Sequence, residues 1–108
     1  MDPEVRQILS ELRSGLEALY GDRLRRLILF GSQARGDAGL GWESDIDVLG
    51  VLADPVDLDA EDERTGDIVA DLSLRHDMLV SLVLMEESRF IHRNGPLLRN
   101  IRREGVPV

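Results

Sequence analysis

Residues 31–36 read GSQARG and residues 44–53 read SDIDVLGVLA, and these two segments decide the fold. The first follows directly after the apolar run 27–30, which predicts a short strand that is buried on both faces and ends at the glycine. A glycine-rich loop comes next, with a helical turn at residues 32–35. The second segment predicts another strand over residues 45–53, because apolar residues recur on both of its faces. One face is expected to carry Ile46, Val48 and Leu52, and the other Asp45, Asp47, Leu49 and Val51.

Helices are expected on both sides of these strands. Apolar residues at three- and four-residue steps predict an amphipathic helix over residues 3–20, which Asp2-Pro3 begins and Gly21 ends. A narrower apolar stripe predicts a helix over residues 60–75. A third strand over residues 77–85 and two short helices over residues 86–94 and 96–103 complete the pattern. The order α-β-β-α-β-α indicates the α/β (α+β) class, and residues 1–108 are expected to form a single domain.

The composition excludes several classes of protein. The 108 residues carry 13 basic and 21 acidic side chains, a formal charge of -8, which argues against a protein whose main task is to grip DNA or RNA in bulk. There is no cysteine, which excludes thiol nucleophiles and Cys-ligated metals. All basic residues are arginine, so a Walker-type phosphate loop is excluded as well. No apolar run is long enough to span a membrane, and the cytoplasm is the expected location.

Asp45 and Asp47 are the clearest candidates for chemistry. Residues i and i+2 of a strand point to the same side about 6.5–7 Å apart, so both carboxylates are expected to reach one cation or a pair of cations. Two carboxylates without histidine or cysteine favour a hard ion such as Mg²⁺. Such pairs also occur on ordinary surface strands. Here, however, the pair begins an otherwise apolar strand, where two carboxylates repel each other unless a cation or donors compensate them.

Gly31 and Ser32 follow a buried strand, a place where main-chain N–H groups of a turn can bind phosphate. Gly31 permits a close approach of the backbone, and the Ser32 hydroxyl can donate to a phosphate oxygen. The simpler alternative is that Gly31 makes a turn and Ser32 caps a helical turn. Arg35 is expected either to neutralise phosphates or to pair with Asp37 at the surface. Ser44 either orients the following main chain or only begins the strand.

Together these residues resemble the signature of the polymerase-β-type nucleotidyltransferase superfamily, in which Gly-Ser precedes a spacer and Asp-x-Asp. More narrowly, Gly-Ser-x-x-Arg-Gly near Ser-Asp-x-Asp resembles the minimal nucleotidyltransferases. The resemblance covers nearly the whole chain, although the spacer has 12 residues where 10 is typical. It implies a nucleotidyltransferase fold, a small mixed β-sheet packed with helices. It also implies that Asp45 and Asp47 are catalytic metal ligands and that the nucleotide is bound by Gly31, Ser32, Arg35 and Ser44.

The resemblance further implies a third acid on the strand after the long helix, and Asp77 is the candidate. In many relatives that acid lies deeper in the strand, closer to the place of Ser81. Both residues are expected on one face of the strand. If Asp77 is the third catalytic and metal-binding residue, the site holds two Mg²⁺ ions. If Ser81 occupies that place instead, one ion loses a carboxylate and the enzyme is expected to be slow or inactive.

The function implied by the resemblance is Mg²⁺-dependent transfer of a nucleoside monophosphate from an NTP, ATP above all, to a hydroxyl group, with release of pyrophosphate. Minimal members commonly pair with a small helical HEPN toxin ribonuclease, whose tyrosine hydroxyl accepts AMP. The expected partner is therefore a HEPN-type toxin, in a hetero-oligomer with this chain. The alternative is a weak or inactive nucleotidyltransferase-fold protein that neutralises its partner by binding alone.

Overall fold

The computed structural model describes residues 2–36 and 45–108. Its helices are α1 (Pro3–Tyr20), the short 3-10 turn η1 (Gly21–Arg23), α2 (Ser32–Arg35), α3 (Leu58–His76), α4 (Glu87–His92) and α5 (Pro96–Glu104). Its strands are β1 (Leu24–Phe30), β2 (Ile46–Leu52), β3 (Val80–Glu86) and β4 (Val106–Pro107). None of the helices in the described ranges combines the length and apolar character needed to cross a bilayer.

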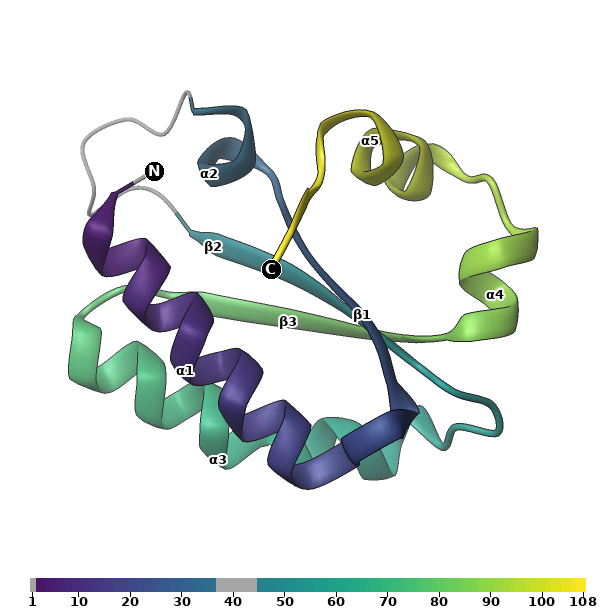
Figure 1. The fold of residues 1–108 in the computed structure, drawn as a ribbon, viewed down its shortest axis with the longest axis horizontal. Coiled ribbons are helices and arrows are strands. Elements are labelled where there is room, and N and C mark those ends of the chain that lie inside the picture. Colours follow the sequence, from purple (N-terminus) through teal and green to yellow (C-terminus); the bar gives the residue numbers. More distant parts are fainter. Residues whose placement is uncertain (1, 37–44) are drawn as a thin grey trace.

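The strands form one mixed sheet in the order β3-β2-β1-β4. β1 runs antiparallel to both β2 and β4, whereas β2 and β3 are parallel. Parallel neighbours need a long crossover, and α3 supplies it. Figure 1 shows the two helices α1 and α3 side by side in the lower half of the view, with α4 at the right and α5 at the top.

Each face of the sheet has its own apolar core. The larger core lies between the sheet and the pair α1 and α3, and it includes Ile46, Val48 and Leu52 of β2. The smaller core joins Leu49 and Val51 to residues of α4 and α5. The assignment of β2 residues to two faces is therefore confirmed, since alternate residues of a strand point to opposite sides.

The local signals at the helix ends act as expected. Asp2 caps α1, because its carboxylate accepts a hydrogen bond of 2.7 Å from the Glu4 N–H, and Gly21 ends the helix with a positive φ of 54°. Asp57 caps α3 by accepting from the Ala60 N–H at 3.3 Å. This cap begins α3 at Leu58, two residues before the predicted start.

The third strand differs from the prediction. Residue 77 was expected to begin it, but α3 extends through His76 and Asp77 forms its C-cap with φ 51° and ψ 42°. A left-handed residue ends a helix and reverses the chain, so the strand begins only at Val80. The two-residue strand β4 was not predicted, because Val106-Pro107 has no periodicity of its own and pairs only by meeting β1.

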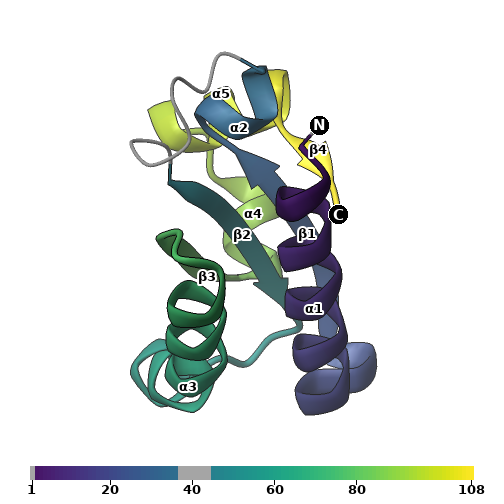
Figure 2. The same ribbon diagram turned by 90° about the vertical axis from the view of Figure 1, so that its left-hand side faces the viewer.

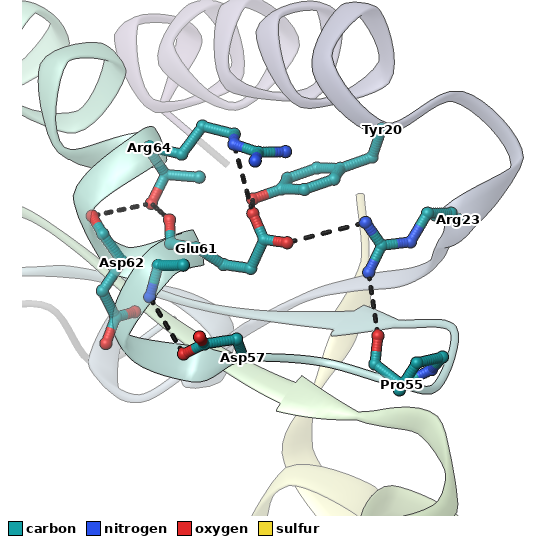
Figure 3. Close-up of polar contacts among 9 residues, drawn as sticks. Tyr20, Arg23, Pro55, Asp57, Glu61, Asp62 and Arg64 are labelled. Carbon is teal, nitrogen blue, oxygen red and sulfur yellow. Dashed lines mark hydrogen bonds and ion pairs between the residues drawn. The ribbon is translucent and has the colours of Figure 1, made fainter.

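A buried polar network holds the end of α1 to the start of α3 (Figure 3). Glu61 is only 5% exposed and is the centre of this network. The Tyr20 hydroxyl donates to Glu61 Oε1 at 3.0 Å, and the guanidinium groups of Arg23 and Arg64 each lie 3.5 Å from a Glu61 oxygen. Arg23 also donates to the Pro55 carbonyl at 3.1 Å. Burial and the bond to Glu61 raise the pKa of Tyr20 to about 12, so Tyr20 remains a neutral donor.

Replacing Tyr20→Phe is expected to lower the free energy of unfolding by about 1–2 kcal/mol, because a buried carboxylate loses its one neutral donor. The midpoint of urea denaturation measures this loss. Nucleotide binding serves as the control: the network lies where β2 ends, away from the Asp-x-Asp segment, so binding should be retained. An unchanged midpoint would contradict the importance of this hydrogen bond.

Candidate functional site

The Gly-Ser and Asp-x-Asp segments meet where β1 ends and β2 begins. Phe30 and Asp47 are paired in the antiparallel ladder, which places Gly31 beside the Asp47 side chain. Gly31 has φ 76°, and a Cβ built on it would lie 2.7 Å from Asp47 Oδ2. The glycine is therefore required twice: for its backbone conformation, which L residues avoid, and for the space that the carboxylate occupies.

The helix α2 starts at Ser32, directly over this end of the sheet (Figure 2). Within the described part of the chain, the main-chain N–H groups of Ser32 and Gln33 donate to no other group, whereas those of Ala34 and Arg35 both donate to the Gly31 carbonyl at 3.1 Å. Free N–H groups at the start of a helical turn suit an anionic oxygen. A nucleotide-binding role of Gly31 and Ser32 stays a prediction.

Arg35 is the last residue of α2, and its guanidinium lies 3.3 Å from the carboxylate of Glu104 on α5. Its contact with α5 was not foreseen, because Glu104 is distant in sequence and only the fold brings it near. Ser44, the other expected nucleotide-binding residue, lies outside the described residues, as does Asp37.

The two aspartates differ in their surroundings. Asp45 precedes β2 and is exposed, while Asp47 is half-buried within the strand. Burial, and then the negative charge of Asp45, raise the pKa of Asp47 above its ordinary value. A carboxylate that is partly removed from water and repelled by its neighbour gains much from a nearby positive charge. Two carboxylates next to free N–H groups therefore fit a divalent cation that carries phosphate oxygens.

Asp77 does not join this pair. It lies at the exposed C-cap of α3, before β3 begins, and no group of three or more His, Cys, Asp or Glu side chains within residues 2–36 and 45–108 is placed to hold a metal ion. The residue of β3 that is paired with Asp47 is Ser81. Paired residues of parallel strands point to the same side, so Ser81 is the β3 side chain nearest to Asp47 in the ladder. A role for Asp77 as metal ligand stays a prediction.

His76 belongs to the helix packing. Its Nε2 lies 2.8 Å from Glu11 Oε2 and its Nδ1 lies 3.5 Å from Glu4 Oε2, both on α1. These contacts join the end of α3 to α1.

Asp47→Asn is expected to raise the Tm of the metal-free protein near pH 7. With a raised pKa in the folded state, Asp47 favours folding below its unfolded pKa, and this contribution is lost as the pH rises through its folded pKa. The charged form therefore opposes folding at neutral pH, and asparagine removes that cost. The difference in Tm between variant and parent should shrink as the pH falls toward 4 and should reverse when Mg²⁺ and an ATP analogue are added. A lower Tm of the metal-free variant at pH 7 would contradict this.

The chain is similar to known proteins in sequence and in fold. A family model described as "Nucleotidyltransferase domain" matches residues 9–107. A protein of Methanocaldococcus jannaschii named "Putative protein adenylyltransferase" is 34% identical to this chain over 85 residues, which are 79% of this chain and 83% of that protein.

Two solved structures have a similar fold. One is a toxin-antitoxin with AMP-PNP; it is 23% identical, with a TM-score of 0.61 over 95% of this chain and 70% of that chain. The other is a tri-AMPylated Shewanella oneidensis HEPN toxin in complex with an MNT antitoxin; it is 21% identical, with a TM-score of 0.55 over 96% of this chain and 67% of that chain. The expected mixed sheet packed with helices is thereby confirmed.

Proposed function

This chain belongs to the nucleotidyltransferase domain family, and we propose that it transfers AMP from ATP to a hydroxyl group on a partner protein. The observation that carries the proposal is the meeting of Gly31, Ser32 and Asp47 at one end of the sheet, where α2, with its unused N–H groups, follows directly after the glycine that lies beside Asp47. Anion-binding and cation-binding groups that lie side by side are what a metal-bound triphosphate requires.

In this proposal each residue has a distinct task. The N–H groups at the start of α2 and the Ser32 hydroxyl hold the terminal phosphates. Asp45 and Asp47 hold Mg²⁺, which supplies positive charge to the phosphates and to the departing pyrophosphate. Arg35 exchanges its contact with Glu104 for a phosphate oxygen. Ser44 orients the main chain that leads to Asp45.

The reaction forms one bond and breaks another. The acceptor oxygen bonds to the α-phosphorus of ATP as the bond between that phosphorus and the β-phosphate bridging oxygen breaks. Pyrophosphate leaves, and the proton of the acceptor hydroxyl is released to water. The chain's own contribution is to position the triphosphate and balance its charge, since phosphoryl transfer depends mainly on positioning and electrostatic stabilisation.

The partner we propose is a small HEPN-type toxin that this chain silences by adenylylation, in a hetero-oligomer in the cytoplasm. The support is the adenylyltransferase name of the M. jannaschii relative and the fold shared with the antitoxin of an AMPylated HEPN toxin complex. Intact-mass analysis tests this: the protein encoded by the adjacent gene is incubated with this chain, ATP and Mg²⁺. A gain of one or more AMP units, absent without ATP, is the expected result, and an unchanged mass would contradict transfer.

A second function is favoured by one observation: the β3 residue paired with Asp47 is Ser81, which has no carboxylate. With two carboxylates the site would hold one nucleotide-bound cation, and a second cation would have fewer protein ligands. The chain would then neutralise its partner by binding, with little transfer. A stable complex of unmodified partner and chain, in the presence of ATP and Mg²⁺, distinguishes this function from the first.

A pair of variants distinguishes Asp77 from Ser81 as the residue at the third ligand position. Ser81→Asp is expected to raise the number of Mn²⁺ ions bound with an ATP analogue, measured by electron paramagnetic resonance, and to lower the Tm of the metal-free protein because a further carboxylate joins Asp47. Asp77→Asn is the matched control, since asparagine tolerates the left-handed C-cap conformation. It should leave the number of bound Mn²⁺ ions unchanged. Loss of a bound ion in Asp77→Asn would instead assign the third ligand to Asp77.

A further inference from the structure

The two edges of the sheet are protected very differently. On the β1 side, β4 pairs with part of the edge, the register is irregular between Leu24 and Arg26, and arginines occupy positions 25 and 26. Such irregularities and charges prevent a foreign strand from pairing. On the other side, β3 pairs only with β2 among the described residues, in unbroken register from Val80 to Glu86. Between these two residues β3 contains no proline and no charged side chain.

The outward-facing main-chain groups of β3 can be identified. The Leu79 carbonyl accepts from the Ile46 N–H at 2.9 Å, so odd-numbered residues turn their main-chain groups toward β2. The Val80 N–H points away from β2 and donates to Ser73 Oγ at 3.0 Å. By the same alternation, the main-chain groups of Leu82 and Leu84 point to the open side of the sheet.

A groove of about 580 Å³ lies between this edge and α3, lined by Gly66, Val69, Ala70 and Leu74 of the helix and by residues 79–82 in part. Two large apolar side chains lie exposed there, Leu74 at 83% and Leu79 at 58%. A Cβ on Gly66 would meet nothing within 4 Å, so the floor of the groove is open. Asp62 lines the groove as well, on a helix that also carries the exposed acids Asp59, Glu63 and Asp67.

We infer that the outer edge of β3 receives an extended segment of the protein acceptor as an added strand, with apolar side chains of that segment in the groove against α3. The inference rests on the proposed function, whose acceptor-docking surface it names. Added strands gain affinity from main-chain hydrogen bonds and specificity from pockets for alternate side chains. The unprotected edge of β3 supplies the main-chain hydrogen bonds, and the apolar groove supplies the pockets for side chains. Asp62 and the net charge of -8 favour a segment with basic residues at its ends.

The edge strand β3 lies next to β2, which carries Asp47, so a segment that docks on β3 comes near the aspartates. Val80 and Leu82 face the groove side with α3, whereas Ser81 faces the same side as Asp47. In an added strand, the residue opposite Ser81 would therefore face the reaction site, while its two neighbours face the groove. Strands lie about 4.8 Å apart, so this residue is two strand spacings, about 10 Å, from β2. The inference therefore places the acceptor hydroxyl on the residue opposite Ser81, between two apolar neighbours that occupy the groove.

Two variants change the docking surface alone. Leu74→Lys and Leu79→Lys place positive charge on the groove that is to receive a basic, apolar segment. Each is expected to lower kcat/KM for the protein acceptor at least tenfold, through KM. Binding of an ATP analogue with Mg²⁺ should be unchanged. Ile91→Lys is the matched control, because Ile91 is 60% exposed but lies on α4, outside the groove. Equal losses in control and groove variants, or none in either, would overturn the inference.

Amide hydrogen exchange tests strand addition directly and does not require transfer. The protein encoded by the adjacent gene is added to the Asp45→Asn, Asp47→Asn double variant, so that the acceptor stays unmodified. Exchange at the Leu82 and Leu84 amides is expected to slow at least tenfold. A complex that leaves these amides unprotected, or protection that appears without the partner and grows with the concentration of this chain alone, would overturn the inference; the latter result would show pairing between two copies.

The two proposals fail in different ways. AMP transfer without protection of β3 would leave the proposed function standing and remove the docking surface. Protection of β3 without AMP transfer by the unchanged chain would keep the docking surface and overturn transfer in favour of neutralisation by binding. Absence of both would overturn both.

Discussion

Asp45→Asn and Asp47→Asn are each expected to reduce AMP transfer by about 10³-fold or more, because loss of charge stabilisation in a phosphoryl-transfer transition state costs several kcal/mol. Asparagine keeps the shape of the side chain and removes the negative charge that holds the cation. The rate of pyrophosphate release in the presence of the acceptor measures the effect, and the Mg²⁺-dependent rise of Tm with an ATP analogue should disappear in parallel.

Asp22→Asn is the matched control for these variants, since Asp22 is an exposed acid of η1, near the end of β2 that lies away from the Asp-x-Asp segment. It should leave transfer within about twofold, because a solvent-exposed charge distant from the reacting groups contributes little. Substantial transfer by both the Asp45 and Asp47 variants would rule out these residues as the metal ligands, whatever the outcome for the partner.

Gly31→Ala is expected to abolish binding of Mg²⁺ and the ATP analogue and to lower the free energy of unfolding by about 1–3 kcal/mol. The new Cβ would lie 2.7 Å from Asp47 Oδ2, so the carboxylate must move. The backbone at φ 76° and ψ -159° also lies in a region that residues with a side chain avoid. Isothermal titration with the ATP analogue and urea denaturation measure the two effects separately.

Gly36→Ala separates strain from collision. Gly36 has nearly the same φ, 78°, but a Cβ there would meet nothing within 4 Å. Its alanine variant should lose only about 1 kcal/mol of stability, the usual cost of a left-handed alanine. Binding of the ATP analogue should be retained. If Gly36→Ala abolished binding as completely as Gly31→Ala, the contact with Asp47 would not be the reason for the glycine.

The local pattern predicted most of the chain's elements. Apolar residues recur at helical steps along residues 3–20, and they predominate along β2, so each signal rests on many residues. Both elements were found where expected. Both faces of β2 were assigned correctly for the same reason. The start of β3 was wrong, because the pattern of apolar residues does not reveal that Asp77 adopts a left-handed conformation.

Contacts between distant segments explain what the pattern missed. Arg35 contacts Glu104, and β4 pairs with β1, only because the chain returns through α5 to the β1 side of the sheet. Glu61, an acid in an acidic helix, is buried against Tyr20 and Arg23. No local spacing distinguishes it from the exposed acids beside it.

The sequence by itself determined which groups make up the candidate site: Gly31-Ser32 follows one strand and Asp45-x-Asp47 begins another, and a spacing of two along a strand puts residues on the same face. The tertiary structure decided which residue of the third strand faces Asp47, because that depends on the register between β2 and β3, which hydrogen bonds between distant segments set. It also decided which edge of the sheet stays open, since an edge exists only once all strands have found their neighbours.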